Sequence, residues 1–149
     1  IDDYQDYAQR VHRLANEINA RHAGAAHSPI MLLAEHHEPD AVYEYHRAAD
    51  LCFVSSLHDG MNLVAKEFVA AQDPADPGAL ILSSLAGAAR ELEGAVIVNP
   101  YDLRGVSQAF ETALAMPLAE RQERHTAMLA ALRGNDLKAW YTNFLAALG

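Results

Sequence analysis

Four short apolar runs recur along the chain and predict the strands of a parallel sheet. Each run is four or five residues long, continuous rather than alternating, and bounded by Gly, Pro, Asp, Ser or Asn. Strands that are buried on both faces have this pattern, whereas strands with one face in water alternate apolar and polar residues. The predicted strands lie at residues 30–34, 51–54, 79–82 and 95–98.

Helical patterns separate these runs. Near the start of the chain, apolar residues recur at steps of three and four and form one stripe, made of Tyr4, Tyr7, Val11, Leu14 and Ile18. Pro39 can open the next helix, since proline fits the first helical turn. Further helices are predicted at residues 63–72, 85–92, 106–115, 118–132 and 137–148.

The alternation of strands with helices predicts an α/β fold, namely a Rossmann-like parallel sheet with helices on both faces and right-handed crossovers. From about residue 117 to residue 149 the pattern is helical only. The sequence shows no repeat, linker or low-complexity tract, so we expect one domain over residues 1–149. Because the chain starts at Ile1, without a methionine and inside a helical pattern, we also expect a piece of a longer protein with an incomplete sheet.

The composition of the chain argues against several classes of binding partner. The net charge of −9 argues against nucleic acid, and the only lysines are Lys66 and Lys138. A phosphate-bearing ligand would therefore depend on backbone amides or on cations supplied from elsewhere. No apolar run approaches the roughly 18 residues of a membrane-spanning helix, so we expect no membrane partner and a cytoplasmic location. The single Cys52 excludes a disulfide framework and is expected to be a buried structural thiol.

The loop after the second predicted strand carries the most specific chemistry. It consists of Ser55-Ser56-Leu57-His58-Asp59-Gly60-Met61-Asn62 and runs straight into a predicted helix. Gly60 lets another group approach the backbone closely, and the helix start offers free N–H groups that suit a diphosphate. Glu67 lies two helical turns farther on the same face, about 11 Å along the axis, where its carboxylate can accept hydrogen bonds from ribose hydroxyls.

These residues also have a plainer interpretation, in which Asp59 caps the helix and Glu67 is a solvated side chain; the spacing is compatible with both. Two further loops follow predicted strands. Residues 83–89 form either a second helix start that faces a ligand or only a tight turn. Residues 99–102 read as a simple connection, with Asp102 as a helix cap.

Other common active sites lack support in the sequence. No pair among the eight histidines has the spacing of the zinc helix motif, and the neighbours His36 and His37 would point apart in an extended chain. We therefore expect no metal site. Neither a Gly-x-Ser-x-Gly elbow nor a glycine-rich dinucleotide fingerprint occurs, so serine hydrolase and oxidoreductase classes are unsupported.

The residues around this loop resemble a known family. The segment at residues 49–72, with Asp-Gly-Met-Asn-Leu-Val at residues 59–64, is similar to the signature of trehalose-6-phosphate synthases. The similarity continues to Phe144, through residues 73–78, 85–92, 98–102, 116–121 and 124–125, Asp136 and Trp140. Members are retaining glycosyltransferases of the GT-B arrangement, with the active site between two Rossmann-like domains. The resemblance implies that this chain is the C-terminal part of the donor-binding domain.

The resemblance also implies a role for each residue of the loop. Asp59, the catalytic candidate, would hold the hydroxyls of the donor sugar together with the backbone of Gly60, Met61 and Asn62. The backbone amides of Leu63 and Val64 would bind the diphosphate. Glu67 would bind the ribose. His36 and His37 lie where the family places the nucleobase, and are weaker candidates.

Two departures from the family pattern bear on activity. The family usually carries arginine where this chain has His58, so a permanent charge with a forked donor geometry is missing. The family's Arg and Lys that neutralise the diphosphate, and its acceptor domain, precede the matching segment. The resemblance therefore implies that the isolated chain shows no transfer activity, because the leaving group is poorly stabilised.

The reaction implied by the resemblance moves glucose, with retention, from a nucleoside-diphosphate glucose to glucose 6-phosphate, giving trehalose 6-phosphate. UDP-glucose is the expected donor, without a cofactor. Two alternatives stay open: another acceptor, such as glycerol 3-phosphate, or a non-catalytic nucleotide-binding or regulatory module. Small molecules are the expected partners, and the open edge of an incomplete sheet would allow a homo-oligomer.

Overall fold

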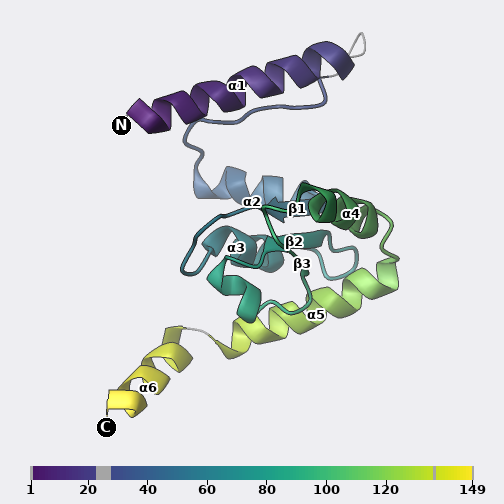
Figure 1. Cartoon of the computed structure of the whole chain (residues 1–149). Coiled ribbons are helices and arrows are strands. Elements are labelled where there is room, and N and C mark those ends of the chain that lie inside the picture. Colours follow the sequence, from purple (N-terminus) through teal and green to yellow (C-terminus); the bar gives the residue numbers. More distant parts are fainter. Residues whose placement is uncertain (1, 23–27, 136, 149) are drawn as a thin grey trace. The chain divides into compact units, whose positions relative to one another are not determined.

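The computed structural model describes residues 2–22, 28–135 and 137–148 (Figure 1). By its internal contacts the chain divides into two compact units, Ile1–His37 and Glu38–Gly149. The prediction of a single domain over residues 1–149 stays a prediction.

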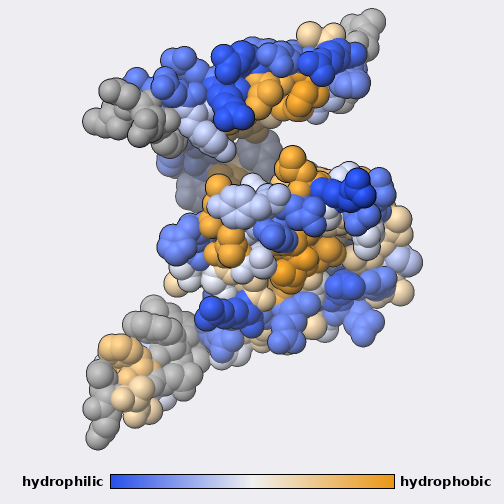
Figure 2. Space-filling view, in the orientation of Figure 1, coloured by the Kyte–Doolittle hydropathy of each residue, from blue (hydrophilic) through white to orange (hydrophobic). Residues whose placement is uncertain are grey.

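The first unit contains one long helix, α1 (Asp2–His22). Figure 2 shows an apolar patch on this unit, next to hydrophilic side chains. After the helix, the side chain of Asn19 holds the returning chain at Ile30: its Nδ2 donates to the Ile30 carbonyl and its Oδ1 accepts the Ile30 N–H, both at 2.8 Å.

The strand predicted at residues 30–34 is wrong. The segment is extended without any strand pairing, because the amide of Asn19 uses both backbone groups of Ile30 and no described strand lies alongside. Its side chains are largely exposed, with Met31 at 81%. A continuous apolar run thus marked a surface segment here rather than a buried strand.

The second unit is built on a parallel sheet, which confirms the predicted α/β fold. Strands β1 (Leu51–Val54), β2 (Ala79–Ser83) and β3 (Val96–Val98) lie in the order β1-β2-β3. The register pairs Leu51 with Ala79 and Ser83 with Val98. The central strand β2 is buried along its whole length, as its uninterrupted apolar sequence predicts.

Helices cover both faces of this sheet, as predicted. On one face, α3 (Leu63–Ala71) and α5 (Leu118–Gly134) pack Phe68 and Met128 against Leu80 and Leu82 of β2. On the other face, α4 (Leu103–Leu114) packs against Ile81, and its Phe110 ring meets that of Phe53 edge-on at 5.1 Å between centroids. Successive side chains of β2 therefore point to opposite faces of the sheet and pack into two separate hydrophobic cores.

Two further helices of this unit match their predictions. Pro39 opens α2 (Pro39–Ala48), which packs beside α3, with the rings of His46 and Phe68 edge-on at 6.1 Å. The helical C-terminus is confirmed as α5 followed by α6 (Leu137–Leu148). No described helix has the length and apolar character that a bilayer crossing demands.

The helix predicted at residues 85–92 is mostly wrong. Only a short 3-10 helix, η1 (Gly87–Arg90), forms there. The backbone N–H groups of Gly87 and Ala88 donate to carbonyls of the loop after β1 instead of being left free at a helix start. The segment therefore serves to hold that loop.

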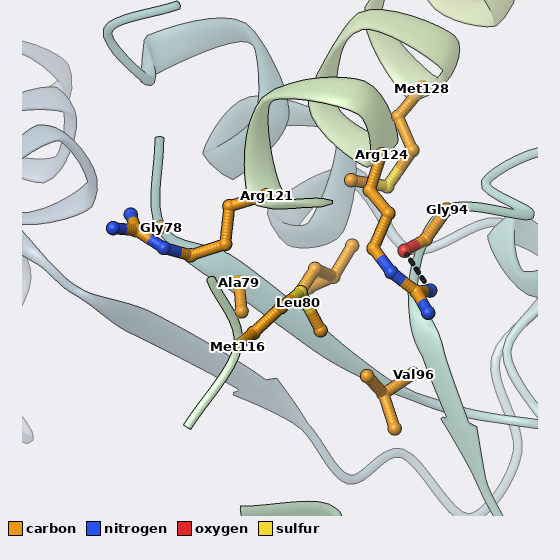
Figure 3. A pocket seen from close by; sticks show the side chains of 9 residues that line it. All are labelled: Gly78, Ala79, Leu80, Gly94, Val96, Met116, Arg121, Arg124 and Met128. Carbon is orange, nitrogen blue, oxygen red and sulfur yellow. Dashed lines mark hydrogen bonds between the residues drawn. The ribbon is translucent and has the colours of Figure 1, made fainter. Parts of the chain in front are cut away.

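The helix α5 lies beside the amino ends of β2 and β3. A cavity of about 10 Å³ lies there, close to the room that one water needs, and is lined by the residues drawn in Figure 3. Arg124 Nη1 donates to the Gly94 carbonyl at 3.1 Å, and Arg121 Nη1 to Asp76 Oδ1 at 2.8 Å. The carboxyl ends of the strands are left for ligand binding, as is usual for parallel sheets.

Candidate functional site

The loops that follow β1 and β2 lie against each other at the carboxyl edge of the sheet. The Gly87 N–H donates to the Asp59 carbonyl at 2.9 Å, and the Ala88 N–H donates to the Met61 carbonyl at 2.7 Å. Asp59 and Ala86 also form an isolated parallel bridge. Of the two interpretations of residues 83–89, the tight turn is the one found, because its amides are used by the neighbouring loop.

Asp59 is fixed inside its own loop. Its Oδ1 accepts the Met61 N–H at 3.0 Å and its Oδ2 accepts Asn62 Nδ2 at 2.9 Å. These bonds, the Met61 N–H first, lower the pKa of Asp59 below the ordinary value of 3.8, with a smaller contribution from the nearby His58. The carboxylate is therefore ionised at neutral pH and held in one orientation.

Asn62, rather than Asp59, caps the helix that follows. Its Oδ1 accepts the Ala65 N–H at 2.9 Å, and its Nδ2 also donates to Ser56 Oγ at 3.2 Å. Its backbone is left-handed, with φ 75°, the only such non-glycine residue among those described. Asparagine tolerates this conformation better than other residues with a side chain, so one residue turns the chain, caps α3 and orients Asp59.

The start of α3 is an accessible position at which an anion can bind. The N–H groups of Leu63 and Val64 lie in the first turn, where an α-helix supplies no acceptor of its own. Their side chains are 59% and 46% exposed. A Cβ placed on Gly60 would meet nothing within 4 Å, so the turn before the helix is not filled by packed side chains. A ligand can approach this backbone.

Glu67 lies four residues after Leu63, about one turn along α3, and is half-buried, outside both hydrophobic cores. The two helical turns predicted between Gly60 and Glu67 are wrong, because the helix begins only at Leu63. Its neighbour Lys66 is engaged elsewhere, with Nζ 2.9 Å from Glu91 Oε2. Within the described residues no hydrogen bond or ion pair engages the Glu67 carboxylate, which leaves it available to a ligand. Its predicted role at the ribose stays a prediction.

The remaining predicted site residues lie in three different segments of the chain. His58 is exposed beside Asp59. His36 and His37 belong to the unit Ile1–His37, and their proposed role at the nucleobase stays a prediction. Asp102 caps α4, with Oδ1 accepting the Gly105 N–H at 3.0 Å, so the loop at residues 99–102 is the connection that was predicted.

Ser83 is a residue that the sequence did not point to. It ends β2 and is fully buried, and its Oγ donates to the Ser56 carbonyl at 2.6 Å while accepting the Leu85 N–H at 3.1 Å. One hydroxyl thus joins the two loops where they leave the sheet. The available signal was a single hydroxyl at the end of an otherwise apolar buried strand.

A thiol and possible metal ligands lie outside the loop. Burial raises the pKa of the Cys52 thiol to about 11, which makes it a poor nucleophile, in line with the expected structural thiol. In the part of the chain that the structure describes, no three His, Cys, Asp or Glu side chains gather as a metal site would need. The absence of a metal from the reaction stays a prediction.

Comparison with known proteins gives one consistent result. The model of "Glycosyltransferase family 20" matches residues 1–149. The trehalose-6-phosphate synthase of Enterobacter sp. (strain 638) is 45% identical over 148 residues, which cover 99% of this chain and 31% of that protein. The chain thus spans about a third of the length of the curated relatives it matches.

Solved structures agree in both fold and sequence. The UDP-forming alpha,alpha-trehalose-phosphate synthase of Burkholderia xenovorans, in complex with glucose-6-phosphate, superposes with a TM-score of 0.95 at 45% identity, over 99% of this chain and 33% of that one. A protein from E. coli bound with UDP-2-fluoro glucose gives a TM-score of 0.95 at 44% identity, with the same coverage. The predicted resemblance is confirmed, whereas the predicted place in the C-terminal part of the donor-binding domain stays a prediction.

Proposed function

The chain belongs to glycosyltransferase family 20, and on that basis we propose that it supplies the donor-binding part of an enzyme that transfers glucose, with retention, from a nucleoside-diphosphate glucose to glucose 6-phosphate. The product is trehalose 6-phosphate. One observation carries the proposal: the open turn at Gly60 leads directly to the free N–H groups of Leu63 and Val64 at the start of α3, beside a fixed, ionised Asp59.

Each group of this loop has a part in binding the donor. Asp59 and the backbone of Gly60, Met61 and Asn62 hold the sugar hydroxyls, because both donors and acceptors are held in place there. The N–H groups of Leu63 and Val64 bind the diphosphate, whose charge the helix start favours. The Glu67 carboxylate accepts hydrogen bonds from the ribose hydroxyls, since no described residue forms a hydrogen bond or ion pair with it.

Transfer with retention requires that the acceptor and the leaving diphosphate share one face of the donor sugar. The acceptor hydroxyl attacks the anomeric carbon from the face that the diphosphate leaves. The leaving diphosphate oxygen takes the proton of that hydroxyl, so no side chain of this loop has to act as the base. The residues here fix the donor while charge builds up on the diphosphate, and the helix amides stabilise part of that charge.

The substrates are proposed from chemistry that the relatives share. A relative bound with UDP-2-fluoro glucose supports UDP-glucose as the donor, and one in complex with glucose-6-phosphate supports the acceptor. We propose that no cofactor or metal takes part. For the chain alone we propose no turnover, because its only cation on α3, Lys66, is paired with Glu91. A cytoplasmic location and homo-oligomeric assembly complete the proposal.

A product assay on the full-length protein tests this function. Several nucleotide-glucose donors are each incubated with glucose 6-phosphate or glycerol 3-phosphate, and the products are separated by chromatography. Trehalose 6-phosphate formed from UDP-glucose supports the proposal. If product forms with glycerol 3-phosphate but not with glucose 6-phosphate, glycerol 3-phosphate is the acceptor. Nucleotide binding without turnover by any pair would instead favour the non-catalytic module.

A further inference from the structure

The short helix η1 contacts the loop at residues 55–62, hereafter the donor loop, on both sides of Gly60. The N–H groups of Gly87 and Ala88 donate to the carbonyls of Asp59 and Met61. These two carbonyls flank Gly60, so η1 fixes the backbone on both sides of the turn that lies open to a ligand. The peptide that joins Gly60 to Met61 is held between the two bonds.

Only glycine allows this approach at position 87. A Cβ there would overlap the carbonyl oxygen of Gly60, lie 2.7 Å from the Gly60 carbonyl carbon and lie 3.2 Å from the Met61 nitrogen. All three atoms belong to one peptide group, which cannot rotate away as a flexible side chain would. Any larger residue must therefore displace that peptide from its position.

The other end of η1 is tied to the helix that binds the diphosphate. Glu91, which follows η1, is paired with Lys66 of α3 at 2.9 Å, and both side chains are partly buried. The start of η1 contacts the donor loop and its end contacts α3. It therefore sets the position of the Gly60–Met61 peptide relative to the helix amides.

We propose that Gly87 is a positioning residue, which places the Gly60–Met61 peptide for contact with the sugar of the donor. This inference rests on the proposed function. It assigns Gly87 to the sugar end of the donor rather than to the diphosphate end. A substitution at this position should therefore weaken binding of the sugar-bearing donor more than binding of the bare nucleotide diphosphate.

The test measures binding of UDP-glucose and of UDP to the full-length protein by calorimetry, for the wild type, Gly87→Ala and Gly78→Ala. Gly78 is the matched control: a Cβ there would lie 2.6 Å from the Ala49 carbonyl oxygen, equally against backbone, at the amino end of β2. For Gly87→Ala we expect the Kd of UDP-glucose to rise at least about tenfold and that of UDP by less than about threefold. For Gly78→Ala, the folded protein should keep the ratio of the two Kd values.

Other outcomes overturn the inference. Equal weakening of UDP and UDP-glucose, or the same change in Gly78→Ala, would show a general loss of structure. If Gly87→Ala does not fold, Glu91→Gln releases the far end of η1 without adding a Cβ. It should raise the Kd of UDP-glucose more than that of UDP, and an unchanged ratio would contradict the inference. A wild type that binds neither ligand would refute the proposed function itself.

Discussion

Asn62 Nδ2 lies 2.9 Å from Asp59 Oδ2, while Asn62 Oδ1 accepts the Ala65 N–H at the same distance. One amide group therefore joins the carboxylate of the donor loop to the first turn of α3. The loop and the helix are positioned together, so a change at Asn62 affects the site through both.

Asn62→Ala should lower stability by about 1–2 kcal/mol, because the cap is lost, and should also raise the KM for the donor. Asp102→Ala is the matched control, since Asp102 caps α4 in the same way, with Oδ1 3.0 Å from the Gly105 nitrogen. Denaturant unfolding and kinetics of the full-length protein check both variants. A similar stability loss is expected for the control, with the donor KM unchanged; a donor KM that moves equally in both would contradict the account.

Asp59→Asn should make the stability of the protein depend less on pH in the acid range. The folded pKa of Asp59 lies below 3.8, chiefly because of the Met61 N–H. A lowered pKa contributes stability above the unfolded pKa, and this contribution is lost as pH falls through the folded value. Between about pH 5 and pH 2 the wild type should therefore lose more stability than the variant. Thermal unfolding across this range is the measurement, and parallel curves would count against the role of these hydrogen bonds.

Glu67→Ala should raise the KM for the donor much more than the KM for the acceptor, at least about tenfold for the donor. The reason is that the ribose hydroxyls of the donor lose the carboxylate that accepts their hydrogen bonds, while the binding site for glucose 6-phosphate is unchanged. Glu111→Ala, on the exposed surface of α4, is the control and should leave both constants unchanged. Initial rates with each substrate varied in turn decide this, and equal increases in both constants would refute the ribose assignment.

His58→Arg should tighten binding of the donor by about two- to fivefold, because arginine supplies a permanent charge and a forked set of donors beside Asp59. The effect should shrink as salt is added, since His58 is exposed. Calorimetric titration with UDP-glucose at low and high salt tests it. Weaker binding of the arginine variant at low salt would show that histidine is the adapted residue in this protein.

The sequence predicted local features well. The runs at residues 51–54 and 79–82 became β1 and β2 because burial on both faces selects such runs, and Asp102 and Pro39 mark helix starts by their own chemistry. These are properties of neighbouring residues, which a sequence displays directly. The residue types of the loop at residues 59–64 drew attention to it, but the spacing allowed both a helix cap and a binding site, and the choice of a binding site came from the family resemblance.

What the sequence missed depends on contacts between distant residues. The run at residues 30–34 has the composition of a strand but no described partner strand. The sequence of the run does not show whether another strand is available to pair with it. Residues 85–92 have helical spacing, yet the loop after β1 takes their amides. The hydroxyl of Ser83 and the missing Cβ of Gly87 matter only because another loop lies within 3 Å.

In the proposed function, the turn at Gly60 receives the donor sugar. Gly60→Ala tests it most directly, because a Cβ there meets nothing within 4 Å of the protein and should leave folding undisturbed. For the full-length protein we predict an unchanged Tm together with a Kd for UDP-glucose raised at least about tenfold, since the added methyl occupies the place of the sugar. An unchanged Tm with an unchanged Kd would contradict the claim.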